Sequence, residues 1–460
     1  MCEVRQTKYV TNERPVRNMT RLEMTAPFGP LRLNIARAQL VFRRLFSSEV
    51  AYALFLMSWA YGGDWSHLGP VSIRLVALIL ASAGIFWRAK RGDVGYSQTA
   101  ILIMLLLFAF YAYAFTSLFW APSGGVGMDR FAVIVSEGIP AFLLGTAIIQ
   151  NSESILRFQI GLILGVAIGA VHCAIWLIAP SRDLLVIFAT VGGYQGLNKM
   201  LGMGAIAIVV ALTYQSRRWW QTILGSVALI VLIIDMVVIG GLSGFLAFLG
   251  CTLLLLALRV DFDRVHMLRL TTSTIIFLAI IASFCVLGIL VGISDQSILP
   301  RGLARIAIEL RSTNQFTATN ILMADSRFYL WHEAINIWAR NPLFGSGLGS
   351  WSLLVGASDL NGIYAHNILL EILGELGLVG ITLFLLPLFL LLQNLRKTWA
   401  QIPAANLSLC LLLVIFLFLH AMSMGNLDAY WTHSAIGLLF IAVNYRAGEK
   451  DTHRSAIPTA

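Results

Sequence analysis

The chain has 460 residues, of which 58% are hydrophobic and 12% charged, and its formal net charge is +9. A soluble globular domain is typically about 45–50% apolar and about 25% charged. The composition therefore excludes that class and predicts a helical membrane protein. In such a protein an excess of basic residues is expected in cytoplasmic loops, so we expect membrane lipids and no nucleic acid as partners. The five cysteines form neither a CxxC pair nor a cluster with histidine, which argues against structural disulfides or zinc.

The first 47 residues are polar and basic. They contain no early apolar segment followed by a small-residue cleavage site, so we expect no signal peptide. We interpret residues 1–47 as a cytoplasmic tail, part of which could form a basic helix on the inner leaflet.

Twelve segments have the length and hydropathy of membrane-spanning helices, which need about 20 mainly apolar residues. They are residues 48–63, 68–87, 97–120, 129–149, 155–179, 197–214, 220–239, 241–258, 268–293, 366–393, 404–424 and 430–446. The sequence thus predicts an all-α polytopic integral membrane protein, with nine spans in 48–293 and three in 366–446.

The orientation follows from the basic residues. With twelve spans, the basic clusters at 88–91, 217–218, 259–269 and 396–397 lie on the same side as both tails. The positive-inside rule assigns that side to the cytoplasm. Both termini, including the tail 447–460, are then cytoplasmic, and residues 294–365 form one large periplasmic loop.

Two parts of this loop, 300–311 and 326–340, have helical spacing. The second has Asn341–Pro342 as a stop signal and is expected to lie flat at the outer membrane boundary. We expect its apolar stripe, which also carries Arg327, to face the mouth of the helix bundle. The stripe consists of Phe328, Trp331, Ile335 and Trp338. The glycine-rich run Gly345–Gly349 is interpreted as a mobile connector to the next span.

That next span is unusually polar. It begins with His366 and Asn367 and continues as an apolar helix that contains Glu371 and Glu375. Polar groups are costly in lipid and usually face a protein interior or a functional path. Helical spacing places the two glutamates on one face, roughly 140–180° away from His366. We therefore expect them to meet another helix, through His420 or an arginine.

Residues 325–351 (DSRFYLWHEAINIWARNPLFGSGLGSW) and 364–380 (YAHNILLEILGELGLVG) together resemble the core region of the O-antigen ligase/polymerase family. Members of this family are bacterial membrane enzymes that move glycans off a polyprenyl-diphosphate carrier. The resemblance implies a GT-C-like helical fold in the inner membrane. It also implies that His366 activates the acceptor hydroxyl and that Arg327 binds the lipid diphosphate. Ligases and polymerases share the motif.

The chemistry of such a transfer suits these residue types. The attacking hydroxyl needs a base, and histidine titrates near neutral pH. The departing diphosphate needs cations, and the planar arginine fork is well suited to bind it. The candidate diphosphate ligands are Arg327, Lys199, Arg130, Arg301 and Arg305, and Asn367, Glu371 and Glu375 are candidate supporting residues. Family members often carry an arginine where this chain has Leu242, so one of the other cations would have to replace it.

No HExxH, DxD, P-loop or GxGxxG motif is present, so we expect metal-independent chemistry without a cofactor. The sequence is interpreted as an O-antigen ligase that moves a glycan from undecaprenyl diphosphate to a lipid A-core acceptor. The alternatives within the same chemistry are a polymerase, whose acceptor is a second lipid-linked glycan, and a protein O-glycosylation enzyme. An alternative of another class is a polysaccharide transporter or flippase, against which no inverted repeat is visible.

Overall fold

The computed structural model describes residues 45–58, 67–68, 71–178, 193–214, 218–239, 242–259, 327–355, 365–424 and 427–446. The chain divides into two units, Met1–Arg43 and Arg44–Ala460, and all described residues belong to the second. The predicted span 268–293 and the candidate ligands Arg301 and Arg305 lie outside the described residues.

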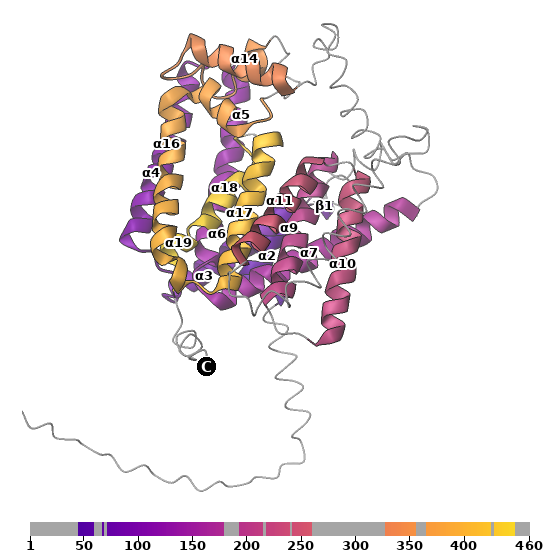
Figure 1. Ribbon diagram of the computed structural model, residues 1–460. Helices are drawn as coiled ribbons and strands as arrows, with labels where there is room; N and C mark the ends of the chain where they lie inside the picture. The colour runs from indigo at the N-terminus through magenta and orange to yellow at the C-terminus, as the bar shows by residue number, and fades with distance from the viewer. Residues whose placement is uncertain are drawn as a thin grey trace, which may run out of the picture. The chain divides into compact units, whose positions relative to one another are not determined.

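Nearly all described residues are helical, as predicted (Figure 1). The α-helices are α2 (Ser48–Met57), α3 (Ile73–Lys90), α4 (Gln98–Thr116), α5 (Gly124–Val133), α6 (Ile139–Ile148), α7 (Ser152–Ile178), α9 (Gly193–Tyr214), α10 (Trp219–Ile239), α11 (Leu242–Arg259), α14 (Arg327–Arg340), α15 (Trp351–Leu354), α16 (Ile368–Thr398), α17 (Ala404–Met424), α18 (Tyr430–Leu439) and α19 (Ile441–Asn444). Short 3₁₀ turns η3 (Ser117–Phe119) and η5 (Trp399–Gln401) extend α4 and α16, and a π-helical turn, η4 (Ile134–Gly138), joins α5 to α6. One antiparallel pair of two-residue strands, β1 (His67–Leu68) and β2 (Val71–Ser72), precedes α3.

Within the part of the chain that the structure describes, seven stretches are long and apolar enough to cross a membrane. They are Gln98–Phe119, Gly124–Ile148, Ser152–Ala170, Gly196–Tyr214, Trp219–Met236, Ile368–Gln401 and Ala404–Met422. The chain is thus a multi-pass membrane protein, although the predicted count of twelve spans is not confirmed. The first predicted span shows one reason, because α2 has 10 residues and a spanning helix needs about 20.

The helices pack into a bundle in which segments far apart in sequence lie side by side. Helix α2 packs against α3 and α7, α9 against α7, α10 and α17, and α16 against α4. Helices α6 and α18 come especially close, because Gly145 faces Gly437 and a Cβ on Gly437 would lie 3.1 Å from the Cα of Gly145. Small residues of this kind allow close helix contact in membranes.

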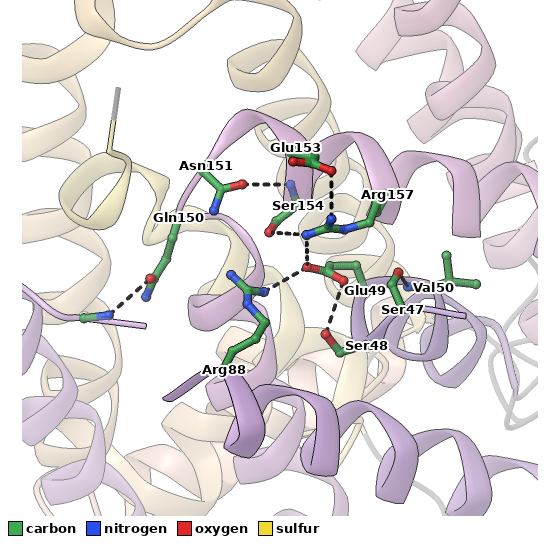
Figure 2. Close-up of polar contacts among 11 residues, drawn as sticks. Ser47, Ser48, Glu49, Val50, Arg88, Gln150, Asn151, Glu153, Ser154 and Arg157 are labelled. Carbon is green, nitrogen blue, oxygen red and sulfur yellow. Dashed lines mark hydrogen bonds and ion pairs between the residues drawn. The ribbon is translucent and has the colours of Figure 1, made fainter. Parts of the chain in front are cut away.

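A buried carboxylate ties three helices together at one end of the bundle (Figure 2). Glu49, at the start of α2, accepts hydrogen bonds from Arg88 of α3 at 2.8 Å and from Arg157 of α7 at 3.0 Å. The Glu49 side chain is only 2% exposed. Arg157 also pairs with Glu153, one turn away on its own helix and 63% exposed.

Several of the described basic segments lie at this same end of the bundle. The backbone N–H of Arg446 donates to the Gln150 carbonyl at 2.8 Å, beside the start of α7. Thr398, at the end of α16, donates its hydroxyl to the Ala442 carbonyl at 3.0 Å. One end of the bundle therefore contains the basic segments 88–91 and 396–397 and Arg446. Helix α14 lies at the other end (Figure 1).

Candidate functional site

The candidate site is built around the start of α16, at the end of the bundle opposite to the basic segments. Asn367 has an extended backbone (φ −154°) and caps the helix. Its side-chain oxygen accepts hydrogen bonds from the N–H groups of Leu369 at 3.1 Å and Leu370 at 3.2 Å. This is the usual capping role of asparagine, and it fixes where α16 begins.

His366, directly before this cap, is half-buried and has a left-handed backbone with φ 51°. Among the described residues it is the only non-glycine with positive φ. Such a conformation costs about 1–3 kcal/mol and persists only where the surroundings impose it, often at functional sites. The backbone of the candidate base is therefore held in a defined conformation directly before the start of α16.

Helix α16 is broken two residues beyond Glu375, the second of its two glutamates. Gly377 has φ 65° and ψ −164°, which interrupts the helical hydrogen-bond ladder. The chain segment 342–347 satisfies the freed backbone groups. Ser346 and Gly347 donate to the carbonyls of Gly374 and Glu375 at 3.1 and 2.8 Å, and Leu378 and Val379 donate to the carbonyls of Pro342 and Leu343 at 2.9 and 3.1 Å. A broken helix can persist at membrane depth only when its backbone is satisfied in this way.

The glycine run Gly345–Gly349 lies inside the structure, and the prediction of a mobile connector is wrong. Residues 345–350 are buried, and Gly345, Gly347 and Gly349 have positive φ values of 70°, 93° and 78°. A Cβ on Gly345 would collide with the backbone of α16 at Glu375. The glycines are needed because the run approaches the break in α16 too closely for any side chain.

Both glutamates of α16 bind one arginine of α5. The Nη1 atom of Arg130 lies 2.9 and 3.1 Å from the two carboxylate oxygens of Glu375, and its Nη2 atom hydrogen-bonds Glu371. Asp428, in the turn before α18, lies 3.6 Å from the same Nη2. The two glutamate side chains are fully buried and that of Arg130 is 15% exposed. The expected partner of the glutamates is thus an arginine and not His420.

Helix α14 packs across the start of α16, but through a different face from the predicted one. The buried residues are Leu330, Ala334 and Ile337, whereas Ile335 is 47% exposed. The prediction followed the bulky apolar residues. The helices instead meet at Ala334 and Gly374, where a Cβ on Gly374 would lie 3.5 Å from the Ala334 carbonyl oxygen. Arg327 is the first residue of α14.

Lys199 of α9 lies inside the bundle, 4% exposed, with its Nζ 3.2 Å from the ring centroid of Trp431. Among the described residues no carboxylate lies within salt-bridge distance of it. Its neighbour Asn198 packs against the start of α11, where a Cβ on Gly244 would lie 2.9 Å from the Asn198 side chain. Helix α11 begins at Leu242, where family members carry an arginine, so the residue next to Lys199 contacts the first turn of that helix.

The structure thus brings Arg130, Glu371 and Glu375 together on the first segment of α16, whose cap is Asn367 and which directly follows His366. The sequence did not indicate a role for Trp351 or Tyr111. The backbone N–H of Trp351 donates to Glu375, and the Tyr111 hydroxyl hydrogen-bonds His433. Tyr111 lies in an apolar segment, and Trp351 takes part through its backbone N–H, so the sequence of neither residue indicates the contact. The described residues contain no cluster of histidine, cysteine or acidic residues suited to a metal ion, and the metal-independent chemistry stays a prediction.

Comparison with known protein families gives a match to part of the chain. Residues 183–385 match the family model described as O-Antigen ligase. This range includes Lys199, α14, His366 and both glutamates of α16, and it ends before Asp428. No curated protein matches the chain. The match confirms the resemblance of the sequence motifs to the O-antigen ligase/polymerase family.

Proposed function

We propose that this membrane glycosyltransferase moves a glycan from undecaprenyl diphosphate to a lipid A-core acceptor at the periplasmic face of the inner membrane. The observation that carries the proposal is the fixed position of His366. It precedes a capped helix and has a backbone conformation that histidine rarely adopts. The family supplies the substrate class, because its members act on lipid-linked glycans.

In the proposed reaction an acceptor hydroxyl attacks the anomeric carbon of the donor sugar. The bond from that carbon to the diphosphate oxygen breaks as the new glycosidic bond forms. His366 takes the proton of the attacking hydroxyl, and undecaprenyl diphosphate leaves with the bonding electron pair. Cations stabilise the negative charge that develops on the departing oxygen.

Two candidate cations fit this role best. Arg327 is at the first turn of α14, which packs on the start of α16. Lys199 is buried without a carboxylate partner among the described residues, and its neighbour Asn198 contacts the first turn of α11, where family members carry an arginine. Arg301 and Arg305 stay candidates from the sequence. Arg130 fits less well, because three carboxylates already surround its guanidinium.

A polymerase would use the same donor site with a second lipid-linked glycan as acceptor. The two activities are separated by a direct assay. Purified protein in detergent is given a lipid-linked glycan together with either lipid A-core or more of the lipid-linked glycan, with and without EDTA. We expect product with lipid A-core in both conditions. Product only with the second lipid-linked glycan would identify a polymerase, and activity lost in EDTA and restored by Mg²⁺ would contradict metal-independent transfer.

The break in α16 bears on the transporter alternative, because transporters commonly place broken helices at a substrate site. In transporters the unwound backbone coordinates the substrate or ion. Here the backbone groups at the break are occupied by hydrogen bonds from and to segment 342–347. This occupation favours an enzyme with a rigid site. Release of a labelled donor across the bilayer of proteoliposomes, without any glycan product, would support the transporter instead.

A further inference from the structure

The polar network around Arg130, Glu371 and Glu375 is suited to position the start of α16. We propose that Arg130 holds the first segment of α16 in the orientation that His366 needs, and does not itself bind the donor diphosphate. This inference rests on the proposed function for the role of His366.

The first argument is where the glutamates point. Glu371 and Glu375 lie one turn apart on one face of α16, and Arg130 binds that face. His366 precedes the cap, so it lies just before the N-terminal end of the same helix. Between the cap at Asn367 and the break at Gly377, the helical segment has only nine residues, Ile368–Leu376. So short a segment is not held in place by its own ladder of hydrogen bonds, because isolated helices of this length are marginal.

The second argument is the number of elements that meet at Arg130. The guanidinium links α5 to α16 and to the turn that carries Asp428. Glu375 also accepts a hydrogen bond at 3.3 Å from the backbone N–H of Trp351, at the end of the buried glycine run. That run is fixed to the start of α5, because Ser123 donates its hydroxyl to the Gly349 carbonyl at 2.7 Å.

The network continues on the other side through the turn before α18. The backbone N–H of Leu427 lies 3.5 Å from the Glu371 carboxylate, and its carbonyl lies 2.9 Å from Nε2 of His433. The Tyr111 hydroxyl lies 2.9 Å from Nδ1 of the same ring. A neutral imidazole with its proton on Nε2 satisfies both contacts, donating to Leu427 and accepting from Tyr111. Arg130 and its carboxylate partners thus connect α5, α16, the end of the glycine run and the turn before α18, and His433 extends the network to α4.

The third argument is electrostatic. Three carboxylates surround a single arginine, and both of its terminal nitrogens are already engaged. An incoming diphosphate would have to displace buried carboxylates and would be repelled by them. Breaking a buried pair by removing one partner is costly because it leaves an uncompensated charge. The arrangement therefore suits a permanent structural ion-pair cluster and not a site that binds and releases an anion.

The test compares Arg130→Met with the triple variant Arg130→Met/Glu371→Gln/Glu375→Gln. In the single variant two buried carboxylates lose their partner, so α16 should shift and kcat should fall about 10²-fold, as for a misplacement of about 1 Å. The donor KM should change little. Neutralising both glutamates removes the unpaired charges, and kcat should recover about tenfold because the three residues act as one unit. Arg130→Lys, which keeps one charge, should retain part of the activity.

A matched control is the pair Arg74 and Glu137, which also joins two segments, with Nη1 2.9 Å from each carboxylate oxygen. The pair lies on α3 and η4 and not on α16, so Arg74→Met/Glu137→Gln should leave the kinetic constants near those of the wild type. A donor KM raised tenfold or more in Arg130→Met, without recovery in the triple variant, would overturn the proposal and make Arg130 a diphosphate ligand.

A readout that needs no activity separates this inference from the proposed function. A single cysteine in place of His366 is reacted with a maleimide, in a background that lacks the native cysteines. Its labelling rate should change when Arg130→Met is added and return toward the original rate in the triple variant. An unchanged rate in all three proteins would refute the positioning role. Absence of any transfer by the wild type would refute the proposed function alone.

Discussion

Lys199 is the residue whose surroundings point most directly to an anionic ligand. It is a buried lysine on the face of Trp431, and among the described residues it has no carboxylate partner. A lysine almost never occupies such a position without compensation. The negative charge of the donor diphosphate would supply it.

We expect Lys199→Met to raise the donor KM about 10- to 100-fold, the equivalent of one lost charge-assisted hydrogen bond of about 1.5–3 kcal/mol. Lys90→Met, at the exposed opposite end of the bundle, is the matched control and should behave as the wild type. Adding Leu242→Arg to Lys199→Met should restore part of the affinity, because α11 begins beside Asn198. A donor KM within twofold of the wild type in Lys199→Met would remove Lys199 from the site.

Part of the candidate site could be predicted from the sequence. Two glutamates inside an apolar helix must be compensated, so a partner on another helix could be predicted. The identity of that partner could not, because Arg130 is more than 240 positions from either glutamate. Nothing in its own surroundings in the sequence distinguishes it from an interfacial arginine.

At the scale of elements, hydropathy located the helices but not their irregularities. The run from Ile368 to Thr398 has the composition of one continuous helix, so the break at Gly377 is invisible in the sequence. The break depends on segment 342–347, whose backbone hydrogen bonds compensate it. The face that α14 presents to α16 could not be predicted from its bulky aromatic residues, because the buried residues are Leu330, Ala334 and Ile337.

The break gives a test of backbone conformation. Gly377→Ala should lower the melting temperature in detergent markedly and abolish most activity. Alanine is strained at positive φ, at a cost of about 1–3 kcal/mol, and its Cβ would collide with the Leu343 carbonyl. Gly250→Ala in α11 is the control, because a Cβ there meets open space and should be neutral or slightly stabilising. Equal melting temperatures for the two variants would contradict the role of the break.

The charged cluster at the other end of the bundle gives a second test at this scale (Figure 2). Glu49→Ala leaves Arg88 and Arg157 side by side without their shared carboxylate, and should destabilise the fold by about 1.5–3 kcal/mol. Glu153→Ala removes an exposed carboxylate from the same Arg157 and should cost much less. Thermal unfolding in detergent checks both. A loss from Glu153→Ala as large as that from Glu49→Ala would contradict the assignment of Glu49 as the tie.

For the whole molecule, the distribution of basic residues predicts the orientation, with the α14 end in the periplasm. Single cysteines at Arg340 and Gln401 test this orientation in a cysteine-free background. Both residues are exposed; Arg340 ends α14, which packs on the start of α16, and Gln401 ends η5, which follows the end of α16. On intact spheroplasts an impermeant maleimide should label the cysteine that replaces Arg340. The one that replaces Gln401 should react only after lysis. The reverse pattern would invert the molecule and place the candidate site in the cytoplasm.

The central claim is that His366 removes the proton of the acceptor hydroxyl. The most direct measurement is the single-turnover transfer rate of purified His366→Ala with a labelled lipid-linked donor, alongside donor binding. The rate should fall about 10²- to 10⁴-fold, the usual contribution of a general base, while donor binding persists. His332→Ala, which removes an exposed histidine of α14, should keep the wild-type rate. Near-normal transfer by His366→Ala would contradict the account, and loss of donor binding alone would make His366 a diphosphate ligand.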